Sequence, residues 1–484
     1  MVSLRGDLSD RWSDLALVAA VKGADLGLQI PLVREFFLAR LLRRLEDTHQ
    51  ACEDDADKLR HDRWFALHLR RFLHRLVEER PAAARAILRF LGTWSRDVFR
   101  RTHAWRGGAV TPCAVVIEPT DRCNLNCPGC YAKSTRQGSD MPYDLLVETV
   151  EQVIEMGVTL VTLSGGEPFL RERSDQTLTR LARRFPDRGF LVYTNGTLLD
   201  AEVADRLGEV GNIFPAISVE GFEHQTDARR GRGIYEQNRR ARQRLAERGV
   251  MTGFSATLTR ENCDAICTDA FLDLRIEEGD MFGWFFLMQP IGRSPRPDLM
   301  VTAAQRARLR ETLRLWREAD RPIFLGDFWN DGPLVGGCIA GGRYYFHIYA
   351  NGDISPCVFA PVACGNIRDI LAGHGPYASL RDFVQRHPVF RAFREEQDRI
   401  QDRARPCLLV DHPAAFRRIA RVKGCYAGKN MAEGYLDGDI ARAIDRAAEE
   451  WAATAATAAT LPPLAGPPAP LRAHADAGRA VVSA

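Results

Sequence analysis

The sequence lacks any uncharged apolar run of about 18 residues, so no membrane-spanning helix is expected. Its opening residues, MVSLRGDLSDRW, also lack an apolar stretch that leads to a small-residue cleavage site. No secretory signal is therefore predicted. Both absences favour a cytoplasmic protein.

The chain has no marked excess of either charge, because 66 Lys and Arg residues stand against 63 Asp and Glu residues, for a net charge of +3. This balance gives no reason to expect a nucleic-acid partner. Apolar residues make up 45% of the chain and charged residues 27%, which is ordinary for a soluble globular protein. A chain of 484 residues is long enough for two or three packed units.

Cysteine, in contrast, is abundant and unevenly placed. Of twelve cysteines, three fall within eight residues, from Cys123 to Cys130, and five more lie between Cys338 and Cys425. In a reducing compartment, clustered cysteines indicate metal binding or catalysis before disulfides.

Residues 1–108 are predicted to be a helical N-terminal segment. In LVREFFLARLLRRL and RWFALHLRRFLHRLV, apolar residues recur three and four positions apart, with arginine between them. We favour a helical segment that packs on the catalytic core. The alternative is a basic amphipathic surface that docks on a membrane or on a long-chain substrate.

Residues 109–330 alternate apolar runs with helical stretches. Six runs are typical of buried strands: CAVVIEPT, VTLVTLSGG, FLVYTNG, FPAISVEG, TGFSATLT and MFGWFFLMQP. This alternation predicts βαβ units and a parallel sheet with right-handed crossovers. The predicted fold class is α/β, and six units favour a partial (β/α)6 barrel, although the count alone does not distinguish it from an open sheet.

The last two regions have different textures. Residues 331–432 are rich in glycine, cysteine and turn signals, and Asn351-Gly352 predicts a two-residue hairpin turn. Residues 433–484 are predicted to be a last helix followed by a disordered Ala/Pro tail.

Cys123, Cys127 and Cys130 follow the first predicted strand directly, in EPTDRCNLNCPGCYA. Thiolates suit soft metals and iron–sulfur clusters. A four-iron cluster wants four ligands, so three cysteines leave one iron open to a small chelating ligand, as an open zinc position binds water. The alternative is a zinc knuckle, which requires a fourth Cys or His close by. Between residues 104 and 160 only Cys113 qualifies, and it sits back in the strand.

The segment CNLNCPGCY resembles the CxxxCxxC motif of the radical S-adenosylmethionine (SAM) superfamily, including the aromatic residue Tyr131. Further motifs of that family appear in order across about residues 112–300. SGGEP is similar to its GGE motif. The resemblance implies that Gly165, Gly166 and Glu167 hold the amino group of SAM's methionine.

Three later segments add to the resemblance. TNG, with Thr194 and Asn195, and SVEG, with Ser218 and Glu220, look like the strand ends that contact the ribose and carboxylate of SAM. QPIGR, with Gly292, is similar to the segment that flanks adenine. Glycines at strand ends let the backbone approach a ligand closely, and parallel barrels bind ligands at the carboxyl ends of their strands. Arg230, in TDARRGRGIYE, is a weaker candidate for the SAM carboxylate, since that stretch also reads as a solvated loop.

The resemblance implies a SAM-binding four-iron four-sulfur cluster, a reductant such as flavodoxin or ferredoxin, and reductive cleavage of SAM to a deoxyadenosyl radical that abstracts hydrogen from a substrate. The cofactor carries this chemistry, and the protein positions it and excludes water.

Cys338 and Cys357 flank the predicted hairpin and resemble the opening of SPASM and twitch domains, which carry auxiliary iron–sulfur clusters in peptide-modifying radical SAM enzymes. Cys407 is the third predicted ligand. The sequence departs from a full SPASM domain because it lacks the dense C-x2-C-x5-C-x3-C run, so a single auxiliary cluster is expected. Its fourth ligand is left open among Cys364, Cys425, Asp411, His412 or the substrate itself. The alternative is a set of buried structural thiols.

Two substrate classes follow. The SPASM-like region points to a peptide or protein, and the basic N-terminal segment allows a lipid or isoprenoid at a membrane surface. A non-catalytic electron-transfer module is the third hypothesis, and the SAM-binding motifs argue against it. Cys263 and Cys267 are interpreted as a core or surface pair, His347 as a packed side chain, and Cys52 and Cys113 as buried thiols.

Overall fold

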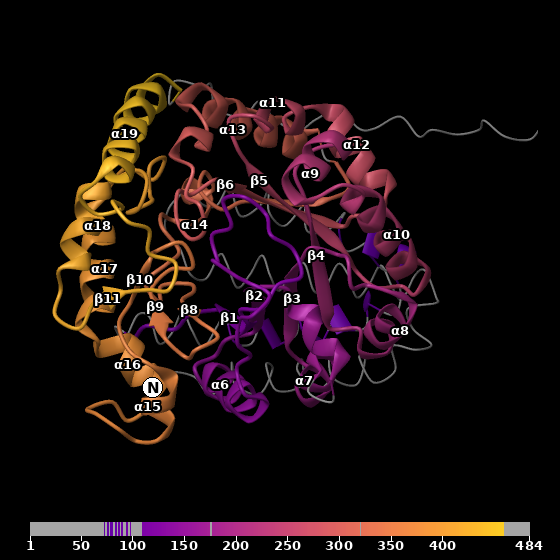
Figure 1. Cartoon of the computed structure of the whole chain (residues 1–484), viewed down its shortest axis with the longest axis horizontal. Helices are drawn as coiled ribbons and strands as arrows, with labels where there is room; N and C mark the ends of the chain where they lie inside the picture. Colours follow the sequence, from indigo (N-terminus) through magenta and orange to yellow (C-terminus); the bar gives the residue numbers. More distant parts are fainter. Residues whose placement is uncertain are drawn as a thin grey trace, which may run out of the picture.

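The computed structural model describes residues 109–174, 177–319 and 321–458, together with a number of residues between 72 and 97. A nine-stranded sheet forms the centre, and helices surround it (Figure 1).

All six strands predicted from the sequence form, and they lie parallel to one another in chain order. They are β1 (Ala114–Thr120), β2 (Leu160–Gly165), β3 (Gly189–Thr194), β4 (Ile213–Val219), β5 (Gly253–Leu258) and β6 (Phe282–Leu287). Their near-continuous apolar runs suit strands that are covered on both faces. All seven residues of β4, for example, are buried.

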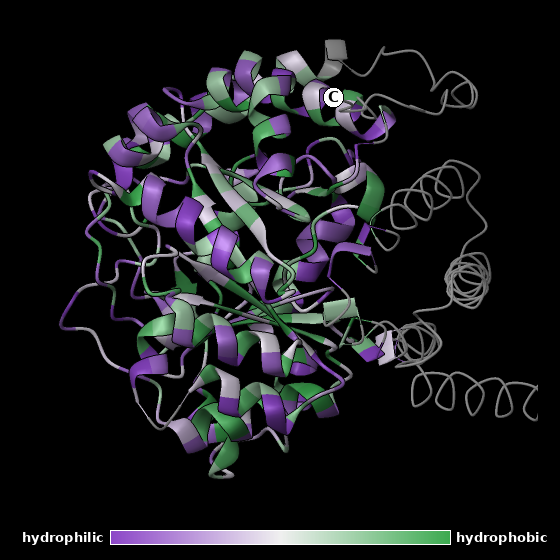
Figure 2. Ribbon diagram, turned by 90° about the vertical axis from the view of Figure 1, so that its right-hand side faces the viewer, coloured by the Kyte–Doolittle hydropathy of each residue, from purple (hydrophilic) through white to green (hydrophobic). Residues whose placement is uncertain are grey.

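Helices connect these strands and flank the curved sheet (Figure 1). They are α6 (Tyr143–Glu155), η1 (Pro168–Arg173), α7 (Leu178–Arg184), α8 (Ala201–Val210), α9 (Glu223–Arg230), α10 (Ile234–Glu247), α11 (Cys263–Ile266), α12 (Asp269–Glu277), η2 (Pro297–Leu299) and α13 (Ala303–Glu318). Hydrophilic residues alternate with apolar ones along the outer helices, whereas the strands between them are largely apolar (Figure 2). The helices therefore bury one stripe against the sheet and present the other to water.

The sheet is longer than predicted at both edges. β7 (Phe324–Asp327) pairs in parallel with β6, and β8 (His347–Ile348) pairs in parallel with β1. β9 (Ile354–Ser355) then pairs antiparallel with β8. The strand order β7-β6-β5-β4-β3-β2-β1-β8-β9 has two separate ends, so the α/β class and the partial barrel are confirmed.

The predicted hairpin is therefore part of the main sheet. Its turn is longer than the predicted two residues, since residues 349–353 separate the two strands. Gly352 has a φ of 92°, the left-handed conformation that glycine adopts without strain.

The described residues of the N-terminal segment are mostly helical and contact the sheet. Phe72, Leu76 and Ile87 share a core with Leu191 and Phe214. This contact agrees with a segment that packs on the barrel. Of the two stretches behind the predicted basic amphipathic surface, residues 32–45 lie outside the described residues, as does Cys52, and residues 63–77 are described only in part.

The C-terminal part adds a small sheet and a layer of helices. β10 (Val362–Ala363) pairs antiparallel with β11 (Tyr426–Ala427). The helices are α14 (Gly332–Val335), α15 (Ile367–Leu371), α16 (Leu380–Arg386), α17 (Pro388–Arg399), α18 (Pro413–Ala420) and α19 (Asp439–Ala458). α17, α18 and α19 follow one side of the barrel, where α19 contacts α13 (Figure 1). Within the described residues, every helix is too short or too polar to cross a membrane, and the Ala/Pro tail lies beyond them.

A buried ion pair joins α10 to the start of β6 and leads to a stability prediction. Arg242 Nε lies 3.1 Å from the Asp280 carboxylate, and the two side chains are 1% and 0% exposed. Arg242→Met removes this partner of a buried charge, so we expect a loss of roughly 3–5 kcal/mol in the free energy of unfolding, measured by chemical denaturation. Arg239→Ala on the same helix breaks only an exposed pair with Glu236 and should cost less than about 1 kcal/mol. Equal losses would contradict the prediction.

Candidate functional site

The three clustered cysteines lie on the loop of residues 121–142 between β1 and α6, called the cysteine loop below. Cys123, Cys127 and Cys130 are free and partly exposed. Gly129 has a φ of 63°, and a Cβ placed there would lie 2.2 Å from Cε of Met288. The loop therefore passes close to the end of β6 and requires glycine at this point.

The end of β2 presses against the same loop through its backbone. Gly166 N donates to Thr120 O at 3.0 Å, and Glu167 N donates to Arg122 O at 2.8 Å. A Cβ on Gly166 would lie 1.9 Å from Arg122 O, and one on Gly165 would lie 2.6 Å from Thr120 O. The two predicted glycines thus let β2 and the loop touch backbone to backbone.

Glu167 is fully buried beside these glycines. Its carboxylate accepts hydrogen bonds from Thr194 Oγ1 at 2.7 Å, Asn195 N at 2.7 Å and Phe169 N at 3.1 Å. Burial raises the pKa of Glu167 to about 7, although these hydrogen bonds oppose the rise. A ligand that donates a hydrogen bond here would stabilise the ionised carboxylate, so the position suits an amino group.

The end of β3 reaches the loop through Asn195. Its Nδ2 donates to Asn124 Oδ1 at 2.8 Å and lies 3.9 Å from Cys123 Sγ. Asn124 in turn donates to Thr197 Oγ1 at 2.8 Å. Thr194 and Asn195, both predicted from the sequence, therefore lie with Glu167 and the first cysteine at one edge of the sheet.

Ser218 and Glu220 lie at the end of β4. Ser218 Oγ is 3.3 Å from Ser255 Oγ on β5. Glu220 is 1% exposed and pairs with Arg229 at 2.8 Å and Arg230 at 2.6 Å. Arg230, predicted as a partner of the SAM carboxylate, is thus held by Glu220 in this structure. Burial lowers the pKa of Arg230, but Glu220 and the thiols of the cysteine loop outweigh burial and raise it.

The segment after β6 holds the other side of the cysteine loop. A Cβ on Gly292 would lie 2.2 Å from Cys130 O. Arg293 N donates to Cys130 O at 2.9 Å, and its guanidinium donates to Ser134 O at 2.6 Å and Cys127 O at 3.1 Å. The sequence interpretation included Arg293 in QPIGR but gave it no role, because nothing local shows that it turns back to the cysteine loop.

The thiols of the cysteine loop influence one another. Burial raises the pKa of Cys123 to about 11, and charge on Glu167, Cys130 and Cys127 adds to the rise. In the part of the chain that is described, no three His, Cys, Asp or Glu side chains converge as a single metal ion requires. In a four-iron cluster each thiolate binds a different iron, so the thiols need not share one point. The donor set fits a cluster, and the close glycine backbones with Glu167 fit a small ligand that carries an amino group.

A second group of thiols consists of Cys338, Cys357 and Cys407, the three predicted auxiliary ligands. Burial raises the pKa of Cys407, and the neighbouring Asp411, Cys338 and Cys357 raise it further. Burial also raises the pKa of Cys357 to about 12, against a hydrogen bond from Tyr345. The three thiols are thus near enough to influence one another's charge, although within the described residues they do not converge on one point as a single metal ion would require.

The candidates for a fourth ligand are engaged elsewhere. The pairing of Ala363 with Tyr426 on β10 and β11 places Cys364 opposite Cys425, and burial together with the neighbouring Cys425 raises the pKa of Cys364. Asp411 binds Arg306 at 2.5 Å. His412 Nε2 lies 2.8 Å from Arg405 O. Burial raises the pKa of both Cys338 and Cys407. Of the four candidates, Asp411 is the one whose negative charge adds to both rises.

An aromatic cluster fills the space between the two groups of thiols. Its members are Tyr131, Phe286, Phe328, Trp329, Tyr345 and Phe359. Ring centroids are 5.4 Å apart for Tyr131 and Phe359, 5.3 Å for Phe359 and Phe328, and 5.8 Å for Phe328 and Tyr345. Contact between rings is thus continuous from the cysteine loop to the neighbour of Cys357.

A buried ion pair lies beside Tyr131. Lys429 Nζ lies 2.5 Å from Glu118 Oε2, and His347 Nε2 lies 3.4 Å from Glu118 Oε1. Burial raises the pKa of Glu118, but Lys429 and His347 outweigh burial and hold it below its usual value. Gly292 N donates to Asn430 O at 2.8 Å, so the segment that carries Lys429 also contacts the loop after β6. His347 is packed, as predicted.

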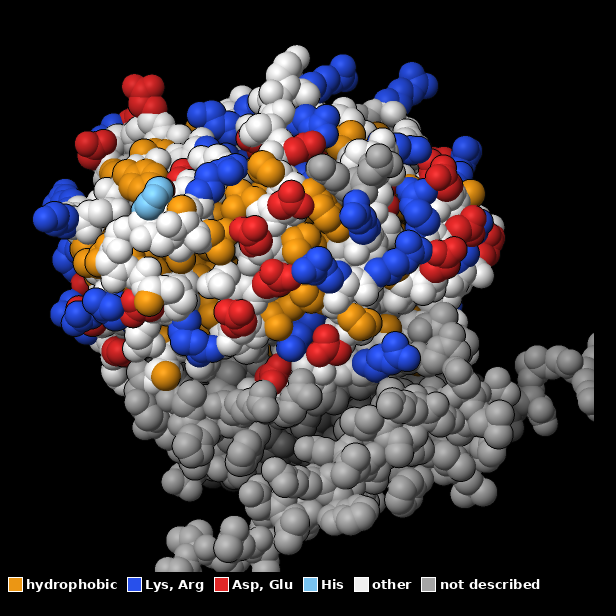
Figure 3. Space-filling view, turned by 90° about the horizontal axis from the view of Figure 1, so that it is seen from below, with side chains coloured by type: hydrophobic (Ala, Val, Ile, Leu, Met, Phe, Trp, Pro, Cys, Tyr) orange, Lys and Arg blue, Asp and Glu red, His pale blue; other side chains and the backbone are white. Residues whose placement is uncertain are grey.

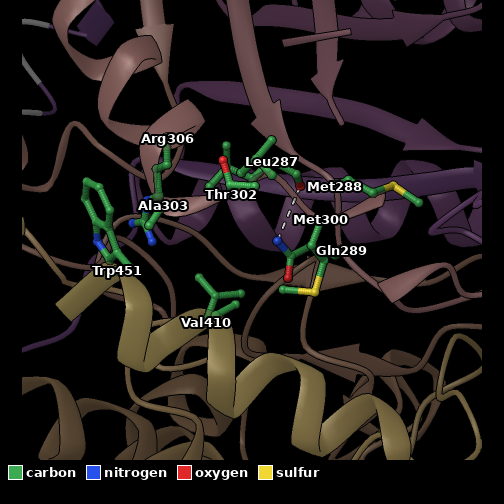
Figure 4. Close-up of a pocket in the computed structure, with 11 residues that line it drawn as sticks. Leu287, Met288, Gln289, Met300, Thr302, Ala303, Arg306, Val410 and Trp451 are labelled. Carbon is green, nitrogen blue, oxygen red and sulfur yellow. Dashed lines mark hydrogen bonds between the residues drawn. The ribbon is translucent and has the colours of Figure 1, made fainter. Parts of the chain in front are cut away.

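A small pocket lies between the end of β6, α13 and α19 (Figure 4). Gln289 projects into it beside Met300, and Arg306 and Trp451 lie together at its other end (Figure 4). Its volume of about 30 Å³ holds about two water molecules. Gln289 Oε1 and Trp451 Nε1 are buried without a hydrogen-bond partner among the described residues. Two waters would satisfy both atoms, so we interpret this pocket as hydrated and too small for a substrate.

The other singled-out cysteines lie apart from both groups. Cys263 and Cys267 are buried with their sulfurs 3.9 Å apart, as expected for a core pair. Cys113, predicted to be buried, is partly exposed. On the face of the molecule seen in Figure 3, positive and negative side chains are interspersed, in keeping with the balanced composition.

Residues 117–266 match the sequence profile of the family described as the radical SAM superfamily. The Fe-coproporphyrin III synthase of Methanosarcina barkeri is 32% identical over 173 residues, which cover 34% of this chain and 41% of that protein. The PqqA peptide cyclase of Bradyrhizobium diazoefficiens is 28% identical over 268 residues, 51% of this chain and 66% of that protein. Among solved structures, SuiB of Streptococcus suis bound to S-adenosylmethionine has a TM-score of 0.47 at 16% identity, covering 62% of this chain and 72% of that one.

The chain spans about two fifths of the length of the synthase that it matches. The family match includes the cysteine loop and the ends of β2, β3 and β4. It stops before Gly292 and before the second group of thiols.

The contact of β2 with the cysteine loop yields a prediction. Gly166→Ala should push the carbonyl group of Arg122 away and distort the cysteine loop, because the added Cβ would lie 1.9 Å from Arg122 O. We expect iron content after reconstitution and SAM affinity each to fall, SAM affinity by at least about tenfold, the equivalent of about 1.4 kcal/mol. Gly208→Ala on α8 is the control, since Gly208 has no positive φ and an added Cβ would come no closer than 3.1 Å, to Arg248 O. Normal iron loading and SAM binding in Gly166→Ala would refute this role.

Proposed function

We propose that this chain, in which residues 117–266 form a radical SAM domain, is an enzyme that cleaves SAM reductively and uses the resulting radical to modify a peptide or protein. The observation that carries the proposal is the meeting of the three thiols of the cysteine loop with a buried carboxylate and close glycine backbones at one edge of the sheet. Parallel barrels bind their ligands at this edge.

Each residue at the edge has a proposed task. Cys123, Cys127 and Cys130 hold a four-iron four-sulfur cluster and leave one iron open. Glu167, ionised, accepts a hydrogen bond from the amino group of SAM. When bound, the cluster and SAM supply a deoxyadenosyl radical that abstracts hydrogen from the substrate.

Other strand ends complete the proposed SAM site. Thr194, Asn195, Ser218 and Glu220 are proposed to contact the ribose and carboxylate of SAM, and Gly292 to flank its adenine. Arg230 reaches the carboxylate of SAM only if it shares its guanidinium with Glu220, to which it is bound. A non-catalytic electron-transfer module would need none of these groups.

Cys338, Cys357 and Cys407 are proposed to hold a single auxiliary cluster. They are buried or partly buried and free of disulfides, and Cys338 and Cys357 both influence the pKa of Cys407. A reductant such as flavodoxin or ferredoxin would supply electrons to the cluster held by the cysteine loop.

A peptide substrate is supported by the similarity to a PqqA peptide cyclase, whose name states a peptide substrate. A tetrapyrrole is a second candidate, favoured by the similarity to an Fe-coproporphyrin III synthase and by the aromatic cluster beside the cysteine loop, since flat rings stack on aromatic side chains. A cytoplasmic location stays a prediction. So does a lipid or isoprenoid substrate at a membrane surface, because it depends on the basic N-terminal segment, most of which lies outside the described residues.

Reductive SAM cleavage is tested by removing one thiol. Protein reconstituted with iron and sulfide should release deoxyadenosine when given dithionite and SAM, and Cys127→Ala should lower that release at least about a hundredfold because the cluster loses one of three ligands. Cys113→Ala, on the same strand–loop unit, should retain the activity. Release at the wild-type rate from Cys127→Ala would exclude the mechanism. Faster release on adding iron-coproporphyrin III would favour the tetrapyrrole.

Iron analysis tests the second cluster separately. Anaerobically reconstituted wild-type protein should hold about eight iron atoms per chain. Replacing Cys338, Cys357 and Cys407 together by alanine should lower this to about four, and replacing Cys263 and Cys267 should not change it. A wild-type protein with only about four iron atoms would rule out the auxiliary cluster.

A further inference from the structure

One sulfur of the second group of thiols has a close side-chain hydrogen-bond partner, a tyrosine hydroxyl. Tyr345 OH lies 2.9 Å from Cys357 Sγ, and the two residues are 4% and 3% exposed. At the cysteine loop, the corresponding side-chain contact is the longer one of 3.9 Å from Asn195 Nδ2 to Cys123 Sγ. The two groups therefore give their sulfurs different surroundings.

The chemistry fixes the direction of this hydrogen bond. A cysteine that binds iron does so as a thiolate, which carries no proton. The Tyr345 hydroxyl is then the donor and the Cys357 sulfur the acceptor. Because both are shielded from water, the bond acts in a medium of low dielectric constant, where it is stronger than at the surface.

The backbone holds Tyr345 in this orientation. Tyr345 N donates to Ile339 O at 3.1 Å, and Gly342 N donates to Tyr345 O at 3.0 Å. This turn begins directly after Cys338, so one short segment carries a thiol and the hydroxyl donor. The ring of Tyr345 also packs edge-on against Phe328 at 5.8 Å. The hydroxyl is thus pointed at Cys357 before any cluster is bound.

We infer that Tyr345 is a positioning residue that raises the reduction potential of a cluster held by Cys338, Cys357 and Cys407. The inference rests on the auxiliary cluster of the proposed function. A hydrogen bond to a ligating sulfur stabilises the reduced cluster more than the oxidised one, because the reduced cluster carries more negative charge. The second cluster therefore accepts an electron more readily than it would without Tyr345.

The test measures a potential. The full-length chain with Cys123, Cys127 and Cys130 replaced by alanine retains the second group alone. In this background, Tyr345→Phe should lower the midpoint potential in an EPR-monitored redox titration and leave the iron content unchanged. Tyr349→Phe is the matched control, because Tyr349 is a buried tyrosine of the same hairpin whose hydroxyl binds Asn430 at 2.9 Å instead of a thiol. It should leave the potential unchanged.

A second substitution covers the case in which Tyr345→Phe does not fold. Replacing Tyr345 by 3-fluorotyrosine keeps the ring and the hydroxyl but makes the hydroxyl a stronger donor, so the midpoint potential should rise. Equal potentials for the parent and the two Tyr345 variants would overturn the inference while leaving the cluster in place. A parent protein that binds no iron would instead overturn the auxiliary cluster itself, and the inference with it.

Discussion

The backbone clamp on the cysteine loop is the constraint on which the rest of the site depends. On one side, Gly166 and Glu167 donate their amides to carbonyls of the loop. On the other side, Arg293 donates its amide and its guanidinium to Cys130, Cys127 and Ser134. These contacts use backbone atoms or one planar cation, so they fix the path of the loop and leave the three thiols free.

The clamp also links the site to the C-terminal part of the chain. The segment of Lys429 and Asn430 reaches the loop after β6 and the end of β1, where Lys429 neutralises the buried Glu118. The aromatic cluster is a second connection between the cysteine loop and the C-terminal part, with rings in contact from Tyr131 to Tyr345. Aromatic rings in contact thus connect the two groups of thiols, so a shift of the backbone at either group would change how these rings pack.

Much of this architecture was predictable from the sequence. The six strands are continuous apolar runs between turn residues, a pattern that local composition alone reveals. β7 was missed because FLGD is short and contains glycine and aspartate, which are depleted in strands. The glycines, Glu167 and the strand-end polar residues were found because each follows a strand directly.

The remaining contacts depend on tertiary structure. Nothing local shows that Arg293 turns back to the cysteine loop or that Glu220 holds Arg230. The placement of Cys364 opposite Cys425 follows from the pairing of β10 with β11, which no local pattern shows. The engagement of Asp411 by Arg306 likewise joins residues that are more than a hundred positions apart.

The central claim is that SAM binds the cysteine loop through its own amino group. The most direct measurement is electron–nuclear double resonance on the reduced, reconstituted protein with SAM labelled with ¹⁵N at the amino position. A hyperfine coupling from the labelled nitrogen to the cluster is the expected result, because the amino nitrogen would bind the open iron while its N–H donates to Glu167. A saturated complex without such a coupling would contradict the account.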